Sequence, residues 1–178
     1  DLGFYSISNG ENFTFFEKLK NKEFKLIYLL GSDNFDFKKN DEFIVYQGSH
    51  GDRGAEIADL ILPSPAFTEQ NGFFLNLEGR LQECRKASYP INGVKEDWKI
   101  FEMIMLKNEQ KKQFRNFNDL RDQAMQNLKN ISNIGELPNF TEFRKDNTNS
   151  KFLDEPVKIR DIDYYFSNSI SRSSKTMS

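Results

Sequence analysis

Three short apolar runs in the first third of the chain predict the strands of one sheet. Residues 24–30 (FKLIYLL) and 43–48 (FIVYQG) are almost continuously apolar, and a third run follows at 60–63 (LILP). Glycine or proline stands at the end of each run, where a turn is expected. Continuous apolar runs are typical of parallel strands, because such strands are buried on both faces. The pattern therefore predicts an α/β fold with a mostly parallel sheet.

Apolar residues at helical spacing predict helices that flank this sheet. One lies within 10–24, and two more are expected at 96–107 and 117–131. The apolar faces expected for the three helices consist of Phe13, Phe16 and Leu19; of Trp98, Phe101, Ile104 and Met105; and of Phe117, Leu120, Ala124, Leu128 and Ile131. Such stripes are typical of core packing, so we do not interpret them as a cofactor site.

The rest of the chain divides into an extended segment and a polar end. Residues 72–86 alternate apolar and polar positions and predict extended structure with a bulge or tight bend at Gly79. We assign 1–107 to the α/β core and 108–178 to a helical and extended C-terminal segment that docks on partners. Within the latter, 144–150 is expected to be an exposed loop, and the tail from 164 is expected to lie on a neighbour or in solvent.

Composition and charge exclude several classes of function. The net charge is −2, and the 25 basic residues are scattered, so no basic stripe indicates binding to nucleic acid. No apolar run approaches the about 20 residues that cross a bilayer. Cys84 is the only cysteine and His50 the only histidine, which excludes an internal disulfide and the usual multi-cysteine metal sites. Cys84 is expected to be a half-buried strand residue.

His50 lies in a loop that resembles an active site in composition. Ser49 and Asp52 are its neighbours, but adjacency along a loop is weak support for a nucleophile, base and carboxylate. Gly48, Gly51 and Gly54 indicate backbone positions that a side chain would obstruct; Asp52 is expected to cap a short helical turn over 54–58. We therefore predict a structural loop in which His50 is held by hydrogen bonds.

Two further polar sets are weak candidates for chemistry. Residues 31–33 (GSD) end the first predicted strand, where a glycine turn can present N–H groups to a phosphate, but no nucleotide motif follows. The densest polar set is Glu69, Asn76, Glu78, Arg80 and Gln82. Glu69 and Glu78 could act as acid and base. The favoured interpretation is a structural network at the Gly79 bend, in which Arg80 bridges Glu78 or Glu69.

Four motifs in order resemble one protein family. They are LIYLLGSD at 26–33, the long segment from FIVYQGSHGDRG to NLEGRLQ at 43–82, KEDWKIF at 95–101 and SNSISRSSKTM at 167–177. The series resembles the C-terminal portion of the large iron–sulfur subunit of respiratory complex I, the NADH:ubiquinone oxidoreductase. Only 108–160 matches poorly. That portion of the family is in turn similar to molybdopterin-dependent oxidoreductases of the formate dehydrogenase type.

The resemblance implies a partial molybdopterin-oxidoreductase-like domain that is free of cofactor. In those oxidoreductases a motif near the pterin matches this chain at Glu69, Gly72, Asn76, Glu78, Gly79, Arg80 and Gln82. The complex I subunit is understood to keep the fold without the molybdenum cofactor, and its iron–sulfur clusters belong to its N-terminal portion. Neither His50 nor Cys84 matches a cluster ligand. The resemblance thus implies no catalytic, cofactor-binding or metal-binding residue in this chain.

The resemblance also implies partners and a location. The expected function is structural support of electron transfer from NADH to ubiquinone in the peripheral arm, beside the cluster-bearing N-terminal half and other peripheral-arm subunits. The missing half is expected either upstream in one long subunit or, as we favour, on a separate polypeptide of a split subunit. The 18 phenylalanines beside one tryptophan are typical of AT-rich organelle genes. The expected location is the matrix side of the mitochondrial inner membrane, or the cytoplasmic face of a bacterial membrane. A molybdopterin-binding fragment and a stand-alone interaction module are the alternatives.

Overall fold

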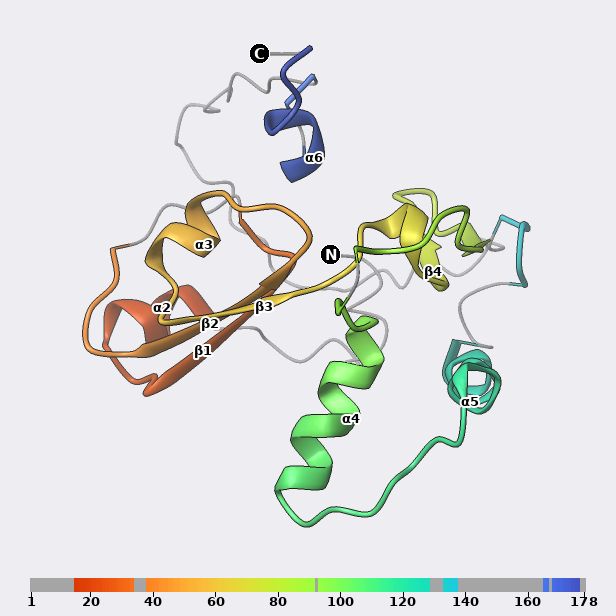
Figure 1. The fold of residues 1–178 in the computed structure, drawn as a ribbon, viewed down its shortest axis with the longest axis horizontal. Helices are drawn as coiled ribbons and strands as arrows, with labels where there is room; N and C mark the ends of the chain where they lie inside the picture. The colour runs from red at the N-terminus through yellow and green to blue at the C-terminus, as the bar shows by residue number, and fades with distance from the viewer. Residues whose placement is uncertain are drawn as a thin grey trace, which may run out of the picture.

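The computed structural model describes residues 15–33, 38–91, 93–128, 133–137, 165–166 and 168–176 of the chain. Several sequence-based expectations lie outside these residues: Phe13 in the first helix, 129–131 at the end of the third, and the loop at 144–150. The described part contains a three-stranded parallel sheet, a two-stranded antiparallel hairpin and the helices around them (Figure 1).

The three predicted strands form one parallel sheet, as the apolar runs indicated. β1 (Leu26–Leu30), β2 (Phe43–Gly48) and β3 (Leu60–Pro63) pair in the order β1-β2-β3. The second and third strands coincide with the predicted ranges, and the first begins at Leu26 rather than at residue 24. The central strand is the most buried, since Ile44 and Gln47 are both fully shielded from solvent.

Helices pack on both faces of the sheet. On one face, Leu19 of α2 (Phe15–Lys20) joins the core residues of β1 and β2, and Ala55 and Ile57 of α3 (Arg53–Ile57) pack against the same cluster. On the other face lies α4 (Asp97–Lys107), whose Phe101 ring is 5.4 Å from the ring of Tyr28 on β1. The arrangement confirms the predicted α/β fold with flanking helices.

The expected core face of the helix at 96–107 is only partly correct. The buried residue of α4 is Ile100, whereas Phe101 and Ile104 are 37% and 38% exposed. The reason is that the side of α4 that carries Ile104 is left open beside β3. Another helix, α5 (Phe117–Leu128), begins where the sequence predicted.

The predicted extended segment at 72–86 is a hairpin of two strands. β4 (Gly72–Leu75) and β5 (Leu81–Cys84) pair in antiparallel fashion, and the short 3-10 helix η1 (Phe67–Glu69) precedes them. Gly79 adopts a φ of +78° in the connecting turn, a conformation that favours glycine. The bend expected at Gly79 is therefore confirmed, and it reverses the chain completely.

Candidate functional site

The loop around His50 is shaped by one buried aromatic ring. Tyr46 of β2 is 2% exposed, and its hydroxyl donates a hydrogen bond of 2.7 Å to the carbonyl of His50. A Cβ added at Gly48 would lie 2.4 Å from the Tyr46 hydroxyl, and one added at Gly54 would lie 2.8 Å from the ring. The glycine requirement predicted at these two positions is confirmed. At Gly51 it is wrong, because an added Cβ would make only an ordinary contact of 3.8 Å.

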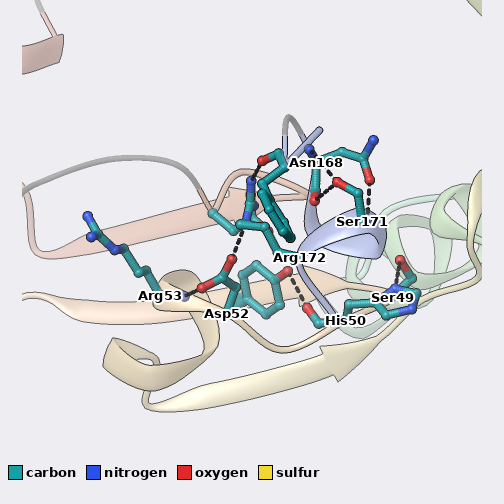
Figure 2. Close-up of polar contacts among 10 residues, drawn as sticks. Ser49, His50, Asp52, Arg53, Asn168, Ser171 and Arg172 are labelled. Carbon is teal, nitrogen blue, oxygen red and sulfur yellow. Dashed lines mark hydrogen bonds and ion pairs between the residues drawn. The ribbon is translucent and has the colours of Figure 1, made fainter. Parts of the chain in front are cut away.

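The side chains of this loop do not form a catalytic triad. Nδ1 of His50 lies 2.9 Å from the hydroxyl of Ser49, which is an exposed residue. The Asp52 carboxylate instead accepts a hydrogen bond from the backbone N–H of Arg53 and one from Arg172 (Figure 2). Asp52 therefore caps α3, as the sequence predicted, and leaves the imidazole without that carboxylate as an orienting partner.

Arg172 forms ion pairs with two aspartates in the loops at the carboxyl edge of the sheet. It stands at the end of α6 (Ser169–Arg172), and its Nη2 lies 2.8 Å from Oδ1 of Asp33 in the loop that follows β1. Its Nε donates to Asp52, 120 residues earlier, and its Nη1 donates to the carbonyl of Phe166 at 3.0 Å. Asp33 is 7% exposed, so the cluster of Arg172, Asp33 and Asp52 lies partly beneath the surface.

The electrostatics of this cluster hold Arg172 and Asp52 in their charged forms. The hydrogen bond from Arg172 lowers the pKa of Asp52, against an opposing effect of burial. Burial acts to lower the pKa of Arg172, but the hydrogen bonds to Asp52 and Asp33 outweigh it and raise that pKa. Burial, together with the two carboxylates, raises the pKa of the Tyr46 hydroxyl. Tyr46 therefore stays protonated and remains the donor to His50.

The position of α6 corrects the expectation for the tail. The sequence placed the tail on a neighbouring polypeptide or in solvent, whereas α6 contacts the loops of its own chain through Arg172. The side chain of Asn168 caps this short helix by accepting from the N–H of Ser171 at 2.9 Å. Sequence reasoning missed the contact because partners 120 residues apart leave no local pattern. Docking of the segment 108–178 on partners stays a prediction.

A second polar network, also missed by the sequence, ties the sheet to α4. Gln47 is fully buried on β2; it accepts from the hydroxyl of Tyr28 and donates to Oδ1 of Asp97 at 2.6 Å. The other oxygen of Asp97 accepts from Gln70 at 2.9 Å. Asp97 lies in the first turn of α4, where a negative charge also favours the helix dipole. The network is structural, because each of its groups is used in joining one element to another.

The polar set at 69–82 is dispersed rather than convergent. Glu69 accepts from the N–H of Ala66 at 3.0 Å, while Glu78 accepts from Asn76 in the hairpin turn at 3.2 Å. The two carboxylates thus serve different parts of the chain and are not brought together as acid and base. Asn76 also accepts from the N–H of Arg80 at 2.9 Å and so fixes the bend, as a structural network would.

The predicted bridge from Arg80 to Glu78 or Glu69 is wrong. Its guanidinium instead donates to the carbonyl of Gly135 at 3.4 Å, while Glu69 and Glu78 accept from the N–H of Ala66 and from Asn76. Gln82 is exposed on β5. Cys84 is half-buried on the same strand, as predicted, with its thiol 3.6 Å from the carbonyl of Phe67.

The described residues hold neither a metal-ligand group nor a membrane-spanning helix. Within that part of the chain, no three His, Cys, Asp or Glu side chains gather as a group that could hold a metal ion. No helix in the same part is both long and apolar enough to pass through a membrane.

A parallel sheet with helices on both faces and loops gathered at its carboxyl edge defines an α/β domain of the doubly covered kind. The sequence matches the molybdopterin oxidoreductase family over residues 4–107, and the chain therefore belongs to that family. The matched range contains the sheet, the hairpin and α4.

The similar proteins include components of NADH oxidoreductases. The chain is 37% identical over 181 residues to a subunit of the NADH-quinone oxidoreductase of Rickettsia conorii, a match that covers 97% of this chain and 26% of that protein. It is 37% identical to the 78 kDa subunit of the mitochondrial NADH-ubiquinone oxidoreductase of Candida albicans, over 86% of this chain and 23% of that subunit. It is 42% identical over 106 residues to the 75 kDa subunit of the NADH-ubiquinone oxidoreductase of Reclinomonas americana. That match covers 58% of this chain and 15% of that subunit.

These relatives confirm the resemblance to the large iron–sulfur subunit of complex I. The chain spans about a quarter, 26%, of the length of the Rickettsia conorii subunit.

The carboxyl edge of the sheet does not fit the phosphates of the pterin cofactor that the family name implies. A pterin dinucleotide carries phosphates, which need N–H donors or positive charge at the carboxyl edge. Here that edge carries Asp33 and Asp52, and the guanidinium of Arg172 is already bound to both. Oδ2 of Asp33 is buried without a hydrogen-bond partner, so it would repel an anion. We therefore assign no step to such a cofactor.

Proposed function

We propose that this chain is a cofactor-free structural part of NADH:ubiquinone oxidoreductase. In this proposal the chain packs against the cluster-bearing polypeptide in the peripheral arm and keeps the electron path from NADH to quinone in place and shielded from water. It contributes no catalytic group of its own. The iron–sulfur clusters belong to the partner half, carried on a separate polypeptide of a split subunit.

One observation carries the proposal. At the carboxyl edge, where open α/β sheets bind ligands, the principal donors, Arg172 and Tyr46, are engaged by contacts within the chain. Arg172 is paired with Asp33 and Asp52, and the hydroxyl of Tyr46 is used by the loop carbonyl of His50. A ligand site would direct such groups toward an open space. Similarity to complex I subunits over 97% of the chain supports the choice of assembly.

The location follows from the same proposal. With relatives in a mitochondrial enzyme and in bacteria, the chain belongs either on the matrix side of the mitochondrial inner membrane or on the cytoplasmic face of a bacterial membrane. The mitochondrial location is favoured by the composition, in which 18 phenylalanines accompany one tryptophan. The other subunits of the peripheral arm are its further neighbours.

A native gel of solubilised membranes, stained for NADH dehydrogenase activity, tests the function. The expected result is that this chain is identified by mass spectrometry in the stained band together with a separate, cysteine-rich polypeptide. Peptides that join the chain to upstream sequence would contradict the split but not the structural role. Absence from the band would contradict membership of the complex. Pterin or molybdenum in the purified protein would support the alternative, a molybdopterin-binding oxidoreductase fragment.

A further inference from the structure

An open apolar groove of about 610 Å³ lies between the edge strand β3 and α4. Its apolar walls come from Leu62 and Pro63 of β3, from Val94 before the helix, and from Ile100, Met103 and Ile104 of α4. The groove belongs to neither the Arg172 cluster nor the hairpin, so nothing described so far accounts for it.

The apolar exposure continues beyond the groove onto the strand edge. Leu60 of β3, on the same face as Leu62, is 44% exposed, and Met103 on the opposite wall is 54% exposed. Strands of a parallel sheet are normally covered on both faces, and a contiguous apolar surface of this kind marks an interaction site. The groove and the adjoining strand edge thus form one uncovered surface.

Two lysines give this surface a positive charge. Lys95 and Lys107 both line the groove and are exposed, and neither forms an ion pair within the described part of the chain. The nearby Lys99 differs, since it pairs with Glu96 at 3.3 Å. A partner that fills the groove would therefore gain from carboxylates placed on either side of an apolar stripe.

From this complementarity we propose that the groove binds an amphipathic helix of the cluster-bearing polypeptide, whose acidic residues flank its apolar stripe and meet Lys95 and Lys107. The inference rests on the proposed function and names the surface through which it acts. The length of the relatives supports this choice of binding partner. The match covers 26% of the Rickettsia conorii protein, so nearly three quarters of that protein could contain the helix that fills the groove. A helix suits the groove better than an added strand, since β3 has four residues and Pro63 lacks an N–H group.

Zero-length carbodiimide coupling of the intact solubilised complex tests the pairing directly, since this reagent joins a lysine amine only to a carboxylate in contact with it. We expect peptides that contain Lys95 or Lys107 to be joined to Asp or Glu residues of the cluster-bearing polypeptide. Lys22, exposed at the end of α2 and outside the groove, is the internal control and should not be joined to those residues. Coupling of Lys95 and Lys107 only within this chain, or to another subunit, would overturn the proposal.

A matched pair of substitutions on α4 tests the apolar wall. Ile104→Glu places a charge in the groove, whereas Leu106→Glu changes a residue of the same helix that is 46% exposed and does not line it. Ile104→Glu should reduce copurification with the cluster-bearing polypeptide about tenfold, the loss of one apolar anchor of an interface. Leu106→Glu should change it less than about twofold. Circular dichroism of each purified chain checks that both variants still fold.

The outcomes separate this inference from the function on which it rests. If the wild-type chain is absent from the complex, the proposed function fails first. If the wild-type chain is present and Ile104→Glu assembles as well as Leu106→Glu, the groove is not the interface and only the inference is overturned. A small apolar molecule in the groove would also give this second result, because assembly would then not depend on the groove.

Discussion

Arg172 and Asp52 are joined by a direct hydrogen bond although 120 residues separate them in sequence. Arg172 also contacts Asp33, so a single guanidinium connects the C-terminal helix α6 to the loops that follow β1 and β2. The side chain of Asp33 is 8% exposed, and that of Arg172 is 23% exposed. Because these ion pairs are mostly shielded from water, their loss should lower the free energy of unfolding more than the loss of an ordinary surface pair.

The first prediction is that Arg172→Ala destabilises the chain by about 3 kcal/mol, since it leaves the carboxylate of Asp33 buried without its cation. Arg172→Lys should recover only part of this loss, because an ammonium cannot reach both carboxylates in the same planar fashion. Urea unfolding followed by circular dichroism measures both. Arg53→Ala, which removes an exposed arginine of α3, is the control and should have little effect. Equal stability of Arg172→Ala and the control would refute the role of the cluster.

The second prediction concerns pH. The hydrogen bond from Arg172 lowers the pKa of Asp52 in the folded chain. A carboxyl group with a lowered folded pKa stabilises the fold above its unfolded pKa of about 3.9, and this contribution is lost as the pH falls through the folded value. The difference in unfolding free energy between wild type and Asp52→Asn should therefore be constant from neutral pH down to about pH 5 and then shrink. Measuring the difference cancels other carboxylates, such as Asp59, whose pKa is lowered by its hydrogen bond from Lys39. A difference that grows on acidification would contradict the assignment.

Local pattern explains which parts of this fold the sequence could predict. The apolar runs gave β2 and β3 their bounds, because a strand covered on both faces leaves a continuous apolar signature. The cap at Asp52 and the bend at Gly79 were also local, each set by one residue and its neighbours. The family resemblance, carried by the order of four motifs, was confirmed by the family match.

The contacts that organise the candidate site could not be predicted in the same way. Gln47 meets Asp97 across 50 residues, and Arg172 reaches Asp52 across 120. Such pairs depend on how the helices and strands pack together, and the spacing of apolar residues along the sequence does not indicate that packing. The expected bridge from Arg80 failed for the same reason, since closeness in sequence within a hairpin did not decide where its side chain points.

The third prediction tests how the Tyr46 ring shapes the loop. Gly48→Ala should destabilise the chain by about 1–3 kcal/mol, the usual cost of forcing extra volume into a packed site. The new Cβ would otherwise lie 2.4 Å from the Tyr46 hydroxyl. Gly51→Ala is the matched control in the same loop, where an added Cβ meets only Ala55 at 3.8 Å. Thermal unfolding of the two variants measures the contrast. If Gly51→Ala were the more harmful of the two, the packing argument would be wrong.

The fourth prediction concerns the join between sheet and helix. Asp97→Ala should cost about 2–3 kcal/mol, because it leaves the donors of Gln47 and Gln70 without their acceptor in a part-buried position. Asp97→Asn should cost less, since its one amide oxygen can still accept one of the two bonds. Unfolding in urea gives both values, and hydrogen exchange of the α4 amides shows whether the helix loosens first. Asp41→Ala, at an exposed position before β2, serves as the surface control. If the amides of the sheet and of α4 lost protection from hydrogen exchange to the same extent, Asp97 would not be a local connection between them.

The last prediction returns to the single histidine. If His50 belongs to a structural loop, His50→Gln should leave the NADH:quinone turnover of the assembled complex unchanged, because glutamine can still contact Ser49 and the Tyr46 bond is made to the backbone carbonyl. Tyr46→Phe removes that backbone bond and should cost about 1 kcal/mol of stability, again without a change in turnover per assembled complex. Turnover must be normalised to the amount of chain in the activity-stained band, so that weaker assembly is not read as weaker chemistry. A loss of turnover in His50→Gln at normal assembly would mean that the imidazole takes part in the reaction, and the structural assignment of this loop would then have to be abandoned.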